Sequence, residues 1–184
     1  ITYNAAISAC DKGGKWERAL ALLEEMGKRK VATDASTYSA AISACGKGGK
    51  LERALALLEE MDKKSKVAPD VAAFNAAISA CEKGGKADQA AALMADMQKR
   101  ELRPNAATYG AAIAACATCG QWERALELLE AMGSASLPKT ARAYGGAIGA
   151  CDKGGEWAKA LDLLTEMKDA GAEPDLSIYS AAIS

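Results

Sequence analysis

The chain has 184 residues, 50% of them hydrophobic, and its 23 lysines and arginines nearly balance 24 aspartates and glutamates. A near-neutral chain has no global basic field, so a polyanionic partner would have to be held by a local patch. The sequence has no histidine, which removes the usual general base and a common zinc ligand. No run of about 18 apolar residues is present to form a membrane-spanning helix.

The first predicted helix has apolar residues at the i, i+3, i+4 and i+7 positions of one face, namely Tyr3, Ala6, Ile7 and Cys10. Gly13 and Gly14 follow and are expected to end it. A second predicted helix carries another such stripe, at Trp16, Ala19, Leu20, Leu23 and Met26. An extended link then reaches Asp34, a residue type suited to a turn or to capping the next helix.

The same pattern returns every 35 or 36 residues along the chain. The segment CDKGGK at Cys10 has counterparts at Cys45, Cys81, Cys116 and Cys151, and an aromatic residue recurs at Tyr3, Tyr38, Phe74, Tyr109, Tyr144 and Tyr179. Such a period predicts an all-α solenoid, because one helix pair alone cannot bury both of its stripes. The predicted repeats are 1–34, 35–70, 71–105, 106–140 and 141–175, with a partial repeat at 176–184, in one continuous array that we expect to be part of a longer chain.

Two recurring motifs have competing interpretations. A phosphate-binding loop needs GxxxxGK[ST] between a strand and a helix, so the glycine pairs are interpreted as turns. The repeated cysteines lie on apolar stripes and are interpreted as core residues. Cys116 and Cys119 form a single CxxC at a helix C-terminus, where the helix dipole disfavours a thiolate, so we expect neither redox chemistry nor a metal site there.

The segment TYNAAISACDKGGKWERALALLEEM, together with the Asp that closes the unit, resembles the pentatricopeptide repeat family. The Trp-Leu-Gly-Tyr pattern of tetratricopeptide repeats is absent. The resemblance covers essentially the whole chain and implies a right-handed superhelix of helix-turn-helix repeats. In this family the first helices line a concave groove that binds single-stranded RNA, about one base per repeat.

The resemblance assigns base selection to two residues of each repeat, the one after the aromatic and the last one. These are Asn4 with Asp34, Ser39 with Asp70, Asn75 with Asn105, Gly110 with Thr140, and Gly145 with Asp175, and Ser180 begins a sixth pair. Family associations give uracil, guanine and a pyrimidine for the first three pairs, none for the fourth and a guanine lean for the fifth. The implied RNA is 5′-U-G-C/U-N-G-3′. Family members usually carry an aliphatic wedge two places before the aromatic; here Ile1 fits, and Arg142 offers stacking on a base instead.

A lysine stands two residues after the recurring cysteine in four repeats, at Lys12, Lys47, Lys83 and Lys153. Two interpretations are open. Cations at these positions stabilise the end of a helix with its partial negative charge. Alternatively, one charge per repeat forms a rail that meets successive RNA phosphates.

The sequence thus predicts sequence-selective binding of single-stranded RNA, with no enzymatic activity, no cofactor, no bound metal and no membrane insertion. The resemblance places this role in the processing, stability or translation of RNA in a mitochondrion or plastid. The alternative is a scaffold that contacts other protein subunits of a large organellar assembly. The neutral charge, the missing aliphatic wedges and the weak fourth and fifth pairs favour that alternative.

Overall fold

A computed structural model describes residues 2–63 and 67–183, and within them the chain forms eleven α-helices and no strand. The helices are α1 (Tyr3–Lys12), α2 (Trp16–Lys28), α3 (Ala35–Lys47), α4 (Leu51–Lys63), α5 (Val71–Gly84), α6 (Ala87–Lys99), α7 (Ala106–Cys119), α8 (Trp122–Ser134), α9 (Ala141–Gly154), α10 (Trp157–Asp169) and α11 (Leu176–Ile183). Ile1, the expected aliphatic wedge, lies outside the described residues. The predicted all-α class is confirmed.

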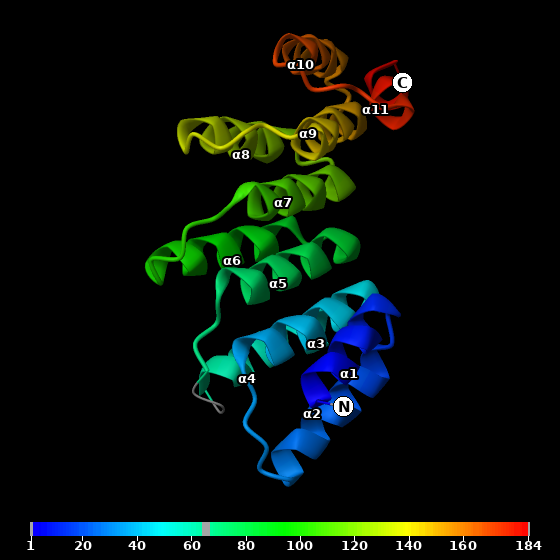
Figure 1. The fold of residues 1–184 in the computed structure, drawn as a ribbon. Helices are drawn as coiled ribbons and strands as arrows, with labels where there is room; N and C mark the ends of the chain where they lie inside the picture. Colours follow the sequence, from blue (N-terminus) through cyan, green and yellow to red (C-terminus); the bar gives the residue numbers. More distant parts are fainter. Residues whose placement is uncertain (1, 64–66, 184) are drawn as a thin grey trace.

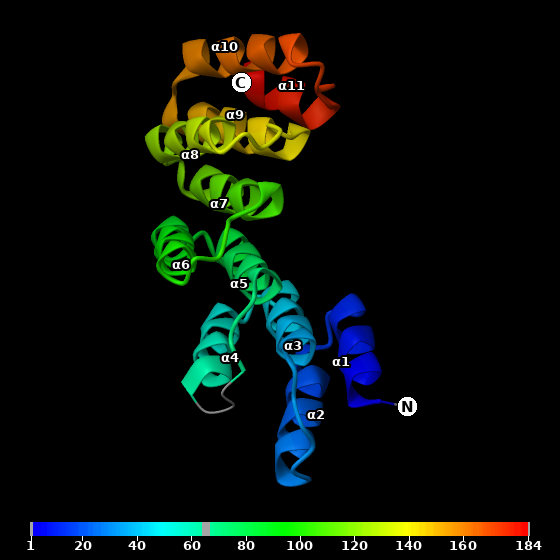
Figure 2. The same cartoon turned by 60° about the vertical axis from the view of Figure 1, so that its left-hand side comes forward.

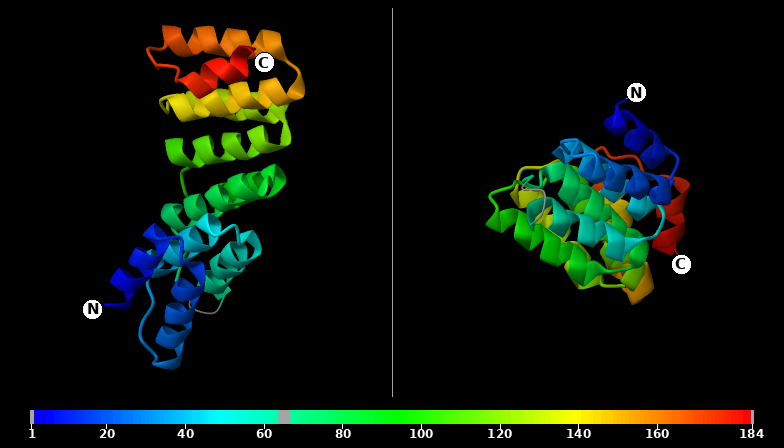
Figure 3. Two further views of the ribbon diagram at one scale, coloured as in Figure 1. Left: turned by 90° about the vertical axis from the view of Figure 1, so that its right-hand side faces the viewer. Right: turned by 90° about the horizontal axis from the view of Figure 1, so that it is seen from below.

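The helices form pairs that stack along one direction, with the two termini at opposite ends of the stack (Figure 1). In a rotated view, α4 and α6 lie along one side of the stack and α1, α3 and α5 along the other (Figure 2). Figure 3 shows the same stacking from the side and from below. We call α1, α3, α5, α7, α9 and α11 the first helices. None of the described helices combines the length and apolar character needed to cross a bilayer.

Each first helix from α3 to α9 begins at a side chain that caps it. The N-cap residues are Asp34, Asp70, Asn105 and Thr140, and each accepts a hydrogen bond from the backbone N–H three residues later. Asp175 does the same ahead of α11, accepting from the N–H of Ile178 at 3.0 Å. Such a cap pairs a donor that the helix itself leaves unpaired and is worth about 1 kcal/mol.

Each of the first helices from α1 to α9 ends near a glycine that adopts a left-handed backbone, the second glycine of a pair in four repeats and the glycine after Cys119 in the fourth repeat. Gly14, Gly49, Gly85, Gly120 and Gly155 have φ between 60° and 75°, a region that other residues rarely enter. The chain reverses at this point and the second helix of the pair begins within a few residues. The interpretation of these glycines as turn residues is confirmed.

The recurring residues form the core between and within the pairs. The buried members of the aromatic series are Tyr38, Phe74, Tyr109 and Tyr144, and those of the cysteine series are Cys45, Cys81, Cys116 and Cys151. Tyr3 and Tyr144 also donate hydrogen bonds from their hydroxyls to Glu25 and Glu166 on the second helix of the same pair, at 3.0 and 3.1 Å. The aromatic series therefore holds the two helices of a pair together.

Neighbouring helix pairs pack against each other through a tryptophan of one pair and a glycine of the next pair. A Cβ added to Gly48 would lie 2.3 Å from Cδ1 of Trp16, and one added to Gly154 would lie 2.3 Å from Cδ1 of Trp122. Both distances are far inside van der Waals contact, so only glycine fits beneath each indole. The fourth repeat has Cys119 in place of this glycine, and Cys119 Sγ donates to the carbonyl of Gly85, the residue that follows α5, at 2.8 Å.

The glycines of α9 have a packing role that the sequence did not reveal. Glycine in a helix interior costs about 1 kcal/mol relative to alanine, which predicts a loose helix here. In the structure, a Cβ on Gly146 would lie 2.9 Å from Cγ2 of Ile113 on α7, and one on Gly145 would lie 3.1 Å from Cγ1 of Ile178 on α11. These two glycines let α9 approach both neighbouring first helices closely.

Candidate nucleic-acid interface

The first helices alone line an open hollow of about 710 Å³. Its walls carry Ser39 and Asn75, two of the predicted base-selecting residues, and two of the predicted phosphate-binding lysines, Lys47 and Lys83. The remaining walls are mostly serine, alanine and glycine, with Asp11, Glu82 and Arg142. The hollow is therefore polar and nearly balanced in charge.

The first predicted pair, Asn4 and Asp34, is joined directly by a hydrogen bond. Asn4 Nδ2 donates to Asp34 Oδ2 at 3.0 Å. Thr37 completes the cluster, because its hydroxyl lies 2.8 Å from Asn4 Oδ1 and 2.7 Å from Asp34 Oδ1, and its backbone N–H donates to Asp34 Oδ1 at 2.8 Å. The Thr37 hydroxyl is the main cause that lowers the pKa of Asp34 below its ordinary value, so this carboxyl is ionised at neutral pH.

The third pair, Asn75 and Asn105, has the same arrangement with an amide in place of the carboxylate. Asn75 Nδ2 donates to Asn105 Oδ1 at 3.3 Å, and the Thr108 hydroxyl donates to Asn75 Oδ1 at 2.5 Å. Asn105 Oδ1 also accepts from the backbone N–H of Thr108 at 3.0 Å. Because Asn105 Oδ1 is occupied by these contacts, the pair offers mainly amide N–H donors to a ligand.

The second pair is joined more weakly. Ser39 Oγ donates to the carbonyl of Ala35 at 2.8 Å and lies 3.4 Å from Asp70 Oδ1. Asp70 Oδ1 is also the cap that accepts from the Ala73 N–H, at 2.8 Å. Both contacts use the same oxygen of Asp70, so its Oδ2 is the oxygen placed to accept hydrogen bonds from a ligand.

The fourth and fifth pairs are not brought together in this way. Thr140 caps α9 through the Ala143 N–H at 3.3 Å, and its predicted partner Gly110 is buried. Asp175 accepts from Ser177 Oγ at 2.6 Å, and its predicted partner Gly145 packs against Ile178. Ser180 lies exposed on α11. The sequence already indicated that these pairs depart from the usual combinations.

Thr37 and Thr108 are the site residues that sequence reasoning missed. Both are buried, and each links the base-selecting residue of one repeat to the closing residue of the same repeat. A signal was present, since each stands three residues after an Asp or Asn cap, where the side chain of a capping box reaches back. Thr108 does so, accepting from the Asn105 backbone N–H at 3.0 Å.

Three of the four predicted lysines contact the preceding first helix. Lys47 Nζ lies 3.1 Å from the Asp11 carbonyl and 3.0 Å from Asp11 Oδ1. Lys83 donates to the carbonyl of Lys47, and Lys153 to that of Thr118, both at 3.4 Å. These carbonyls lie at helix C-termini, so the contacts agree with the first interpretation for the three lysines, while binding to phosphate stays a prediction. All four side chains, including that of Lys12, are exposed.

Four of the five recurring cysteines are buried core residues, Cys10 is half-buried against the core, and Cys119, which is not one of the series, is exposed. Burial raises the pKa of the Cys81 and Cys116 thiols to about 11, so both are protonated at neutral pH. The described part of the chain holds no group of three or more His, Cys, Asp or Glu side chains that could bind a metal ion.

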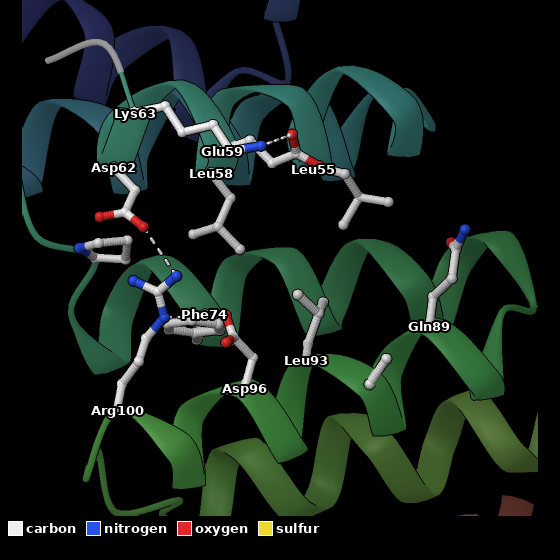
Figure 4. A pocket seen from close by; sticks show the side chains of 12 residues that line it. Leu55, Leu58, Glu59, Asp62, Lys63, Phe74, Gln89, Leu93, Asp96 and Arg100 are labelled. Atoms are coloured by element: carbon white, nitrogen blue, oxygen red, sulfur yellow. Dashed lines mark hydrogen bonds and ion pairs between the residues drawn. The ribbon is translucent and has the colours of Figure 1, made fainter.

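A second cavity, of about 290 Å³, opens between α4 and α6 on the side of the second helices (Figure 4). Leu55, Leu58 and Leu93 supply its apolar wall. Arg100 lies over the Phe74 ring, 5.8 Å from its centroid, and pairs with Asp62 at 2.9 Å and Asp96 at 3.0 Å. Arg100 thus bridges two carboxylates, and Lys63 pairs with Glu59 at 3.0 Å, so the charged groups of this cavity are held in ion pairs with one carboxylate in excess.

Two family models match the chain. One, described as the pentacotripeptide-repeat region of PRORP, matches residues 2–140, and the other, described as the PPR repeat, matches residues 143–171. Among curated protein sequences, none matches.

Solved structures are similar over the whole chain. The chain aligns over 100% of its length with the pentatricopeptide repeat protein PPR10 from maize, at 27% identity and a TM-score of 0.69, and with PPR10 in complex with an 18-nt psaJ RNA element, at 27% identity and a TM-score of 0.77. It spans only 26% and 27% of those two chains. The PPR domain of Arabidopsis thaliana protein-only RNase P 1, in complex with tRNA, has the same fold, with a TM-score of 0.79, 18% identity, and 97% and 96% of the two chains covered.

These structures are built from stacked helix pairs, so the predicted right-handed solenoid of helix-turn-helix repeats is confirmed. The chain belongs to the pentatricopeptide repeat family.

Proposed function

We propose that this array binds single-stranded RNA with sequence selectivity, one base per repeat, and that it binds RNA without cutting it. The observation that carries the proposal is the joining of predicted base-selecting residues into hydrogen-bonded pairs on the first helices. The similarity to PPR10 in complex with an RNA element supports it.

The donors and acceptors left on the first three pairs suit the bases that the family resemblance implies. Asn4 and Asp34 offer an amide N–H beside an ionised carboxylate, which fits the adjacent O4 acceptor and N3–H donor of uracil. Asp70 offers a carboxylate oxygen, which fits the N1–H and N2–H donors of guanine. Asn75 and Asn105 offer N–H donors, which fit the O2 and N3 acceptors of cytosine or the carbonyl oxygens of uracil. A wrong base leaves one of these groups unpaired, which is the source of selectivity.

The polarity of the hollow favours RNA over the scaffold alternative. Protein interfaces are centred on large aromatic or aliphatic anchors that fill apolar pockets. The described walls of the hollow instead carry serine, asparagine, lysine and arginine side chains and two carboxylates, Asp11 and Glu82, with alanine and glycine between them. Short polar groups are suited to base edges and lysines to phosphates.

The test is the affinity of the chain for short oligonucleotides that carry 5′-U-G-C-N-G-3′ or its permutations. We expect about tenfold weaker binding when the first base is changed from uracil to guanine, since an unpaired buried group costs about 1–3 kcal/mol. Equal affinity for scrambled sequences would contradict selective binding, and capture of a protein partner in place of RNA would favour the scaffold.

A matched variant comes from the chain itself. Asn4→Ser gives the first repeat the Ser–Asp pair of the second repeat, so the preferred first base should change from uracil to guanine. The preferences for the second and third bases should not change, and they serve as the internal control.

We also propose that the protein acts in a mitochondrion or plastid, which rests on the family resemblance alone. A fluorescent fusion of the full-length protein in intact cells tests this, and a nuclear or cytosolic signal would contradict it.

A further inference from the structure

In the five complete predicted pairs, the residue after the aromatic is buried only in the fourth pair, where it is Gly110. Its counterparts Asn4, Ser39, Asn75 and Gly145 are all partly exposed to solvent. What covers Gly110 is Arg142, from the start of α9. A Cβ added to Gly110 would lie 3.6 Å from Cδ of Arg142 and 3.9 Å from its Cγ and Nε. The base-selecting position of the fourth repeat is therefore occupied by the side chain of Arg142.

The guanidinium of Arg142 continues past α7 and ends at α5. Its Nη2 donates to Glu82 Oε2, on the helix two repeats earlier, and both residues line the hollow that holds Ser39 and Asn75. Arg142 remains 58% exposed, against 29% for Glu82. It is thus an exposed cation laid along the groove, and its aliphatic part packs over Gly110, where a side chain larger than a methyl group would compete for the same space.

We propose that Arg142 supplies the base contact of the fourth repeat and that this base is guanine. The inference rests on the proposed function and deepens it, because the family resemblance gave no base for the pair of Gly110 with Thr140. A guanidinium has donors only, arranged as a planar fork. Guanine presents two adjacent acceptors, O6 and N7, on its Hoogsteen edge, and this edge is exposed in single-stranded RNA.

The other bases fit the fork less well. Adenine places an amino donor beside N7, and cytosine places one on the same edge, so each would oppose a donor of Arg142. Uracil offers the single acceptor O4 there. In the RNA-free protein the carboxylate of Glu82 stands in for the acceptors of the base, and guanine would take its place on the guanidinium.

A phosphate could also bind a guanidinium, but position argues for the base. Arg142 crosses the residue that selects the base in the other repeats, whereas the predicted phosphate-binding lysines lie at the opposite, C-terminal ends of the first helices. Glu82, the ion-pair partner of Arg142, stands next to Lys83 near the C-terminal end of α5, so the experiment must separate a base contact from a phosphate contact.

The experiment compares RNAs that differ only at the fourth base, with guanine, 7-deazaguanine, adenine, cytosine or uracil. We expect guanine to bind about tenfold more tightly than the other natural bases. 7-Deazaguanine, which lacks only the N7 acceptor, should bind several-fold more weakly than guanine. Arg142→Lys keeps the charge but loses the fork, so it should bind the four natural bases within about twofold of one another. Gly110→Asn, which fills the space under Arg142, should also remove the preference.

The preferences at the first and third bases are the internal control in every arm. If they persist while the fourth base makes no difference to the wild-type protein, the contact with Arg142 is wrong and the proposed function stands. Equal losses for all four bases in Arg142→Lys would indicate a phosphate contact and also overturn the proposal. Loss of preference at every position overturns both.

Discussion

At the scale of single residues, two buried threonines decide how the predicted base-selecting side chains are presented. The hydroxyl of Thr37 lies against Asn4 Oδ1, which directs Asn4 Nδ2 toward Asp34, and Thr108 does the same for Asn75 and Asn105. The second pair, Ser39 with Asp70, has Ala73 at the equivalent place and is the most loosely joined of the three. Threonine at this position therefore fixes the orientation of an asparagine amide.

Thr37→Val should raise the pKa of Asp34, since the Thr37 hydroxyl is the main cause of its lowered value. A lowered folded-state pKa gives stability that is present above the unfolded value of about 3.9 and is lost as the pH falls through the folded value. The variant should therefore lose less stability on acidification than the wild type. An NMR titration of the Asp34 carboxyl carbon checks this, with Thr37→Ser as the control that keeps the hydroxyl. An unchanged pKa in Thr37→Val would mean that the backbone N–H of Thr37 is the larger cause.

At the scale of helices, the stacking of neighbouring pairs depends on matched sizes. Trp16 occupies the space that a side chain at Gly48 would fill, and Trp122 does so at Gly154. Where the tryptophan is replaced by the smaller Leu51, a Cβ at Gly84 would lie 3.1 Å from Leu51 Cδ2, a milder contact. A large residue at the start of a second helix thus requires glycine at the end of the next first helix.

Gly48→Ala should destabilise the fold by about 1–3 kcal/mol through overpacking against Trp16. Its φ of −80° is open to alanine, so strain in the backbone is not the cause. In a Trp16→Ala background the same substitution should cost almost nothing, which a double-mutant cycle measured by urea denaturation would detect. Gly27→Ala, at a helical glycine with open space around its Cβ, is the control and should stabilise by up to about 1 kcal/mol. Additive effects of the Gly48 and Trp16 changes would contradict the packing argument.

At the scale of the whole molecule, four exposed lysines lie at the C-terminal ends of first helices, one in each of α1, α3, α5 and α9, although the net charge of the chain is −1. Binding to a single strand becomes weaker with salt by a slope of about 0.7 for each phosphate contacted. A local row of cations is sufficient for such contacts, so a neutral chain does not argue against RNA.

Replacing Lys12, Lys47, Lys83 and Lys153 by alanine should weaken RNA binding at every sequence and reduce the slope of log affinity against log salt by about 3. The matched control removes four lysines from the last turns of second helices, Lys28, Lys63, Lys99 and Lys168, and should leave the slope nearly unchanged. Because three of the first set also bind helix carbonyls, urea denaturation of both variants must show folded protein first. Equal slopes in the two variants would contradict the binding of the first four lysines to RNA phosphates.

Much of the fold could be predicted from the sequence, because a residue that every repeat needs recurs at the same spacing along the chain. The recurring cysteines, aromatic residues and glycine pairs lie where the period places them, in the core and at the turns. Contacts between repeats could not be predicted in the same way. Arg142 and Glu82 are 60 residues apart, and only the stacking of α5, α7 and α9 brings them together. From the sequence of α9 alone, its glycines predict a helix of low stability. The positions of α7 and α11 are needed to show that two of these glycines allow close packing between helices.

The residue that closes each repeat is also the N-cap of the next first helix. This second role limits which substitutions there can change the base that the repeat prefers. Asp34, Asp70, Asn105 and Thr140 are all N-caps, and the residues that cap well are Asn, Asp, Ser, Thr and, less strongly, Gly. Exchange among these types alters the hydrogen bonds offered to a base while the helix keeps its cap. Exchange for any other type loosens a helix by about 1 kcal/mol. The need for a helix N-cap therefore limits which hydrogen-bonding groups this position can offer to a base, independently of any bound nucleic acid.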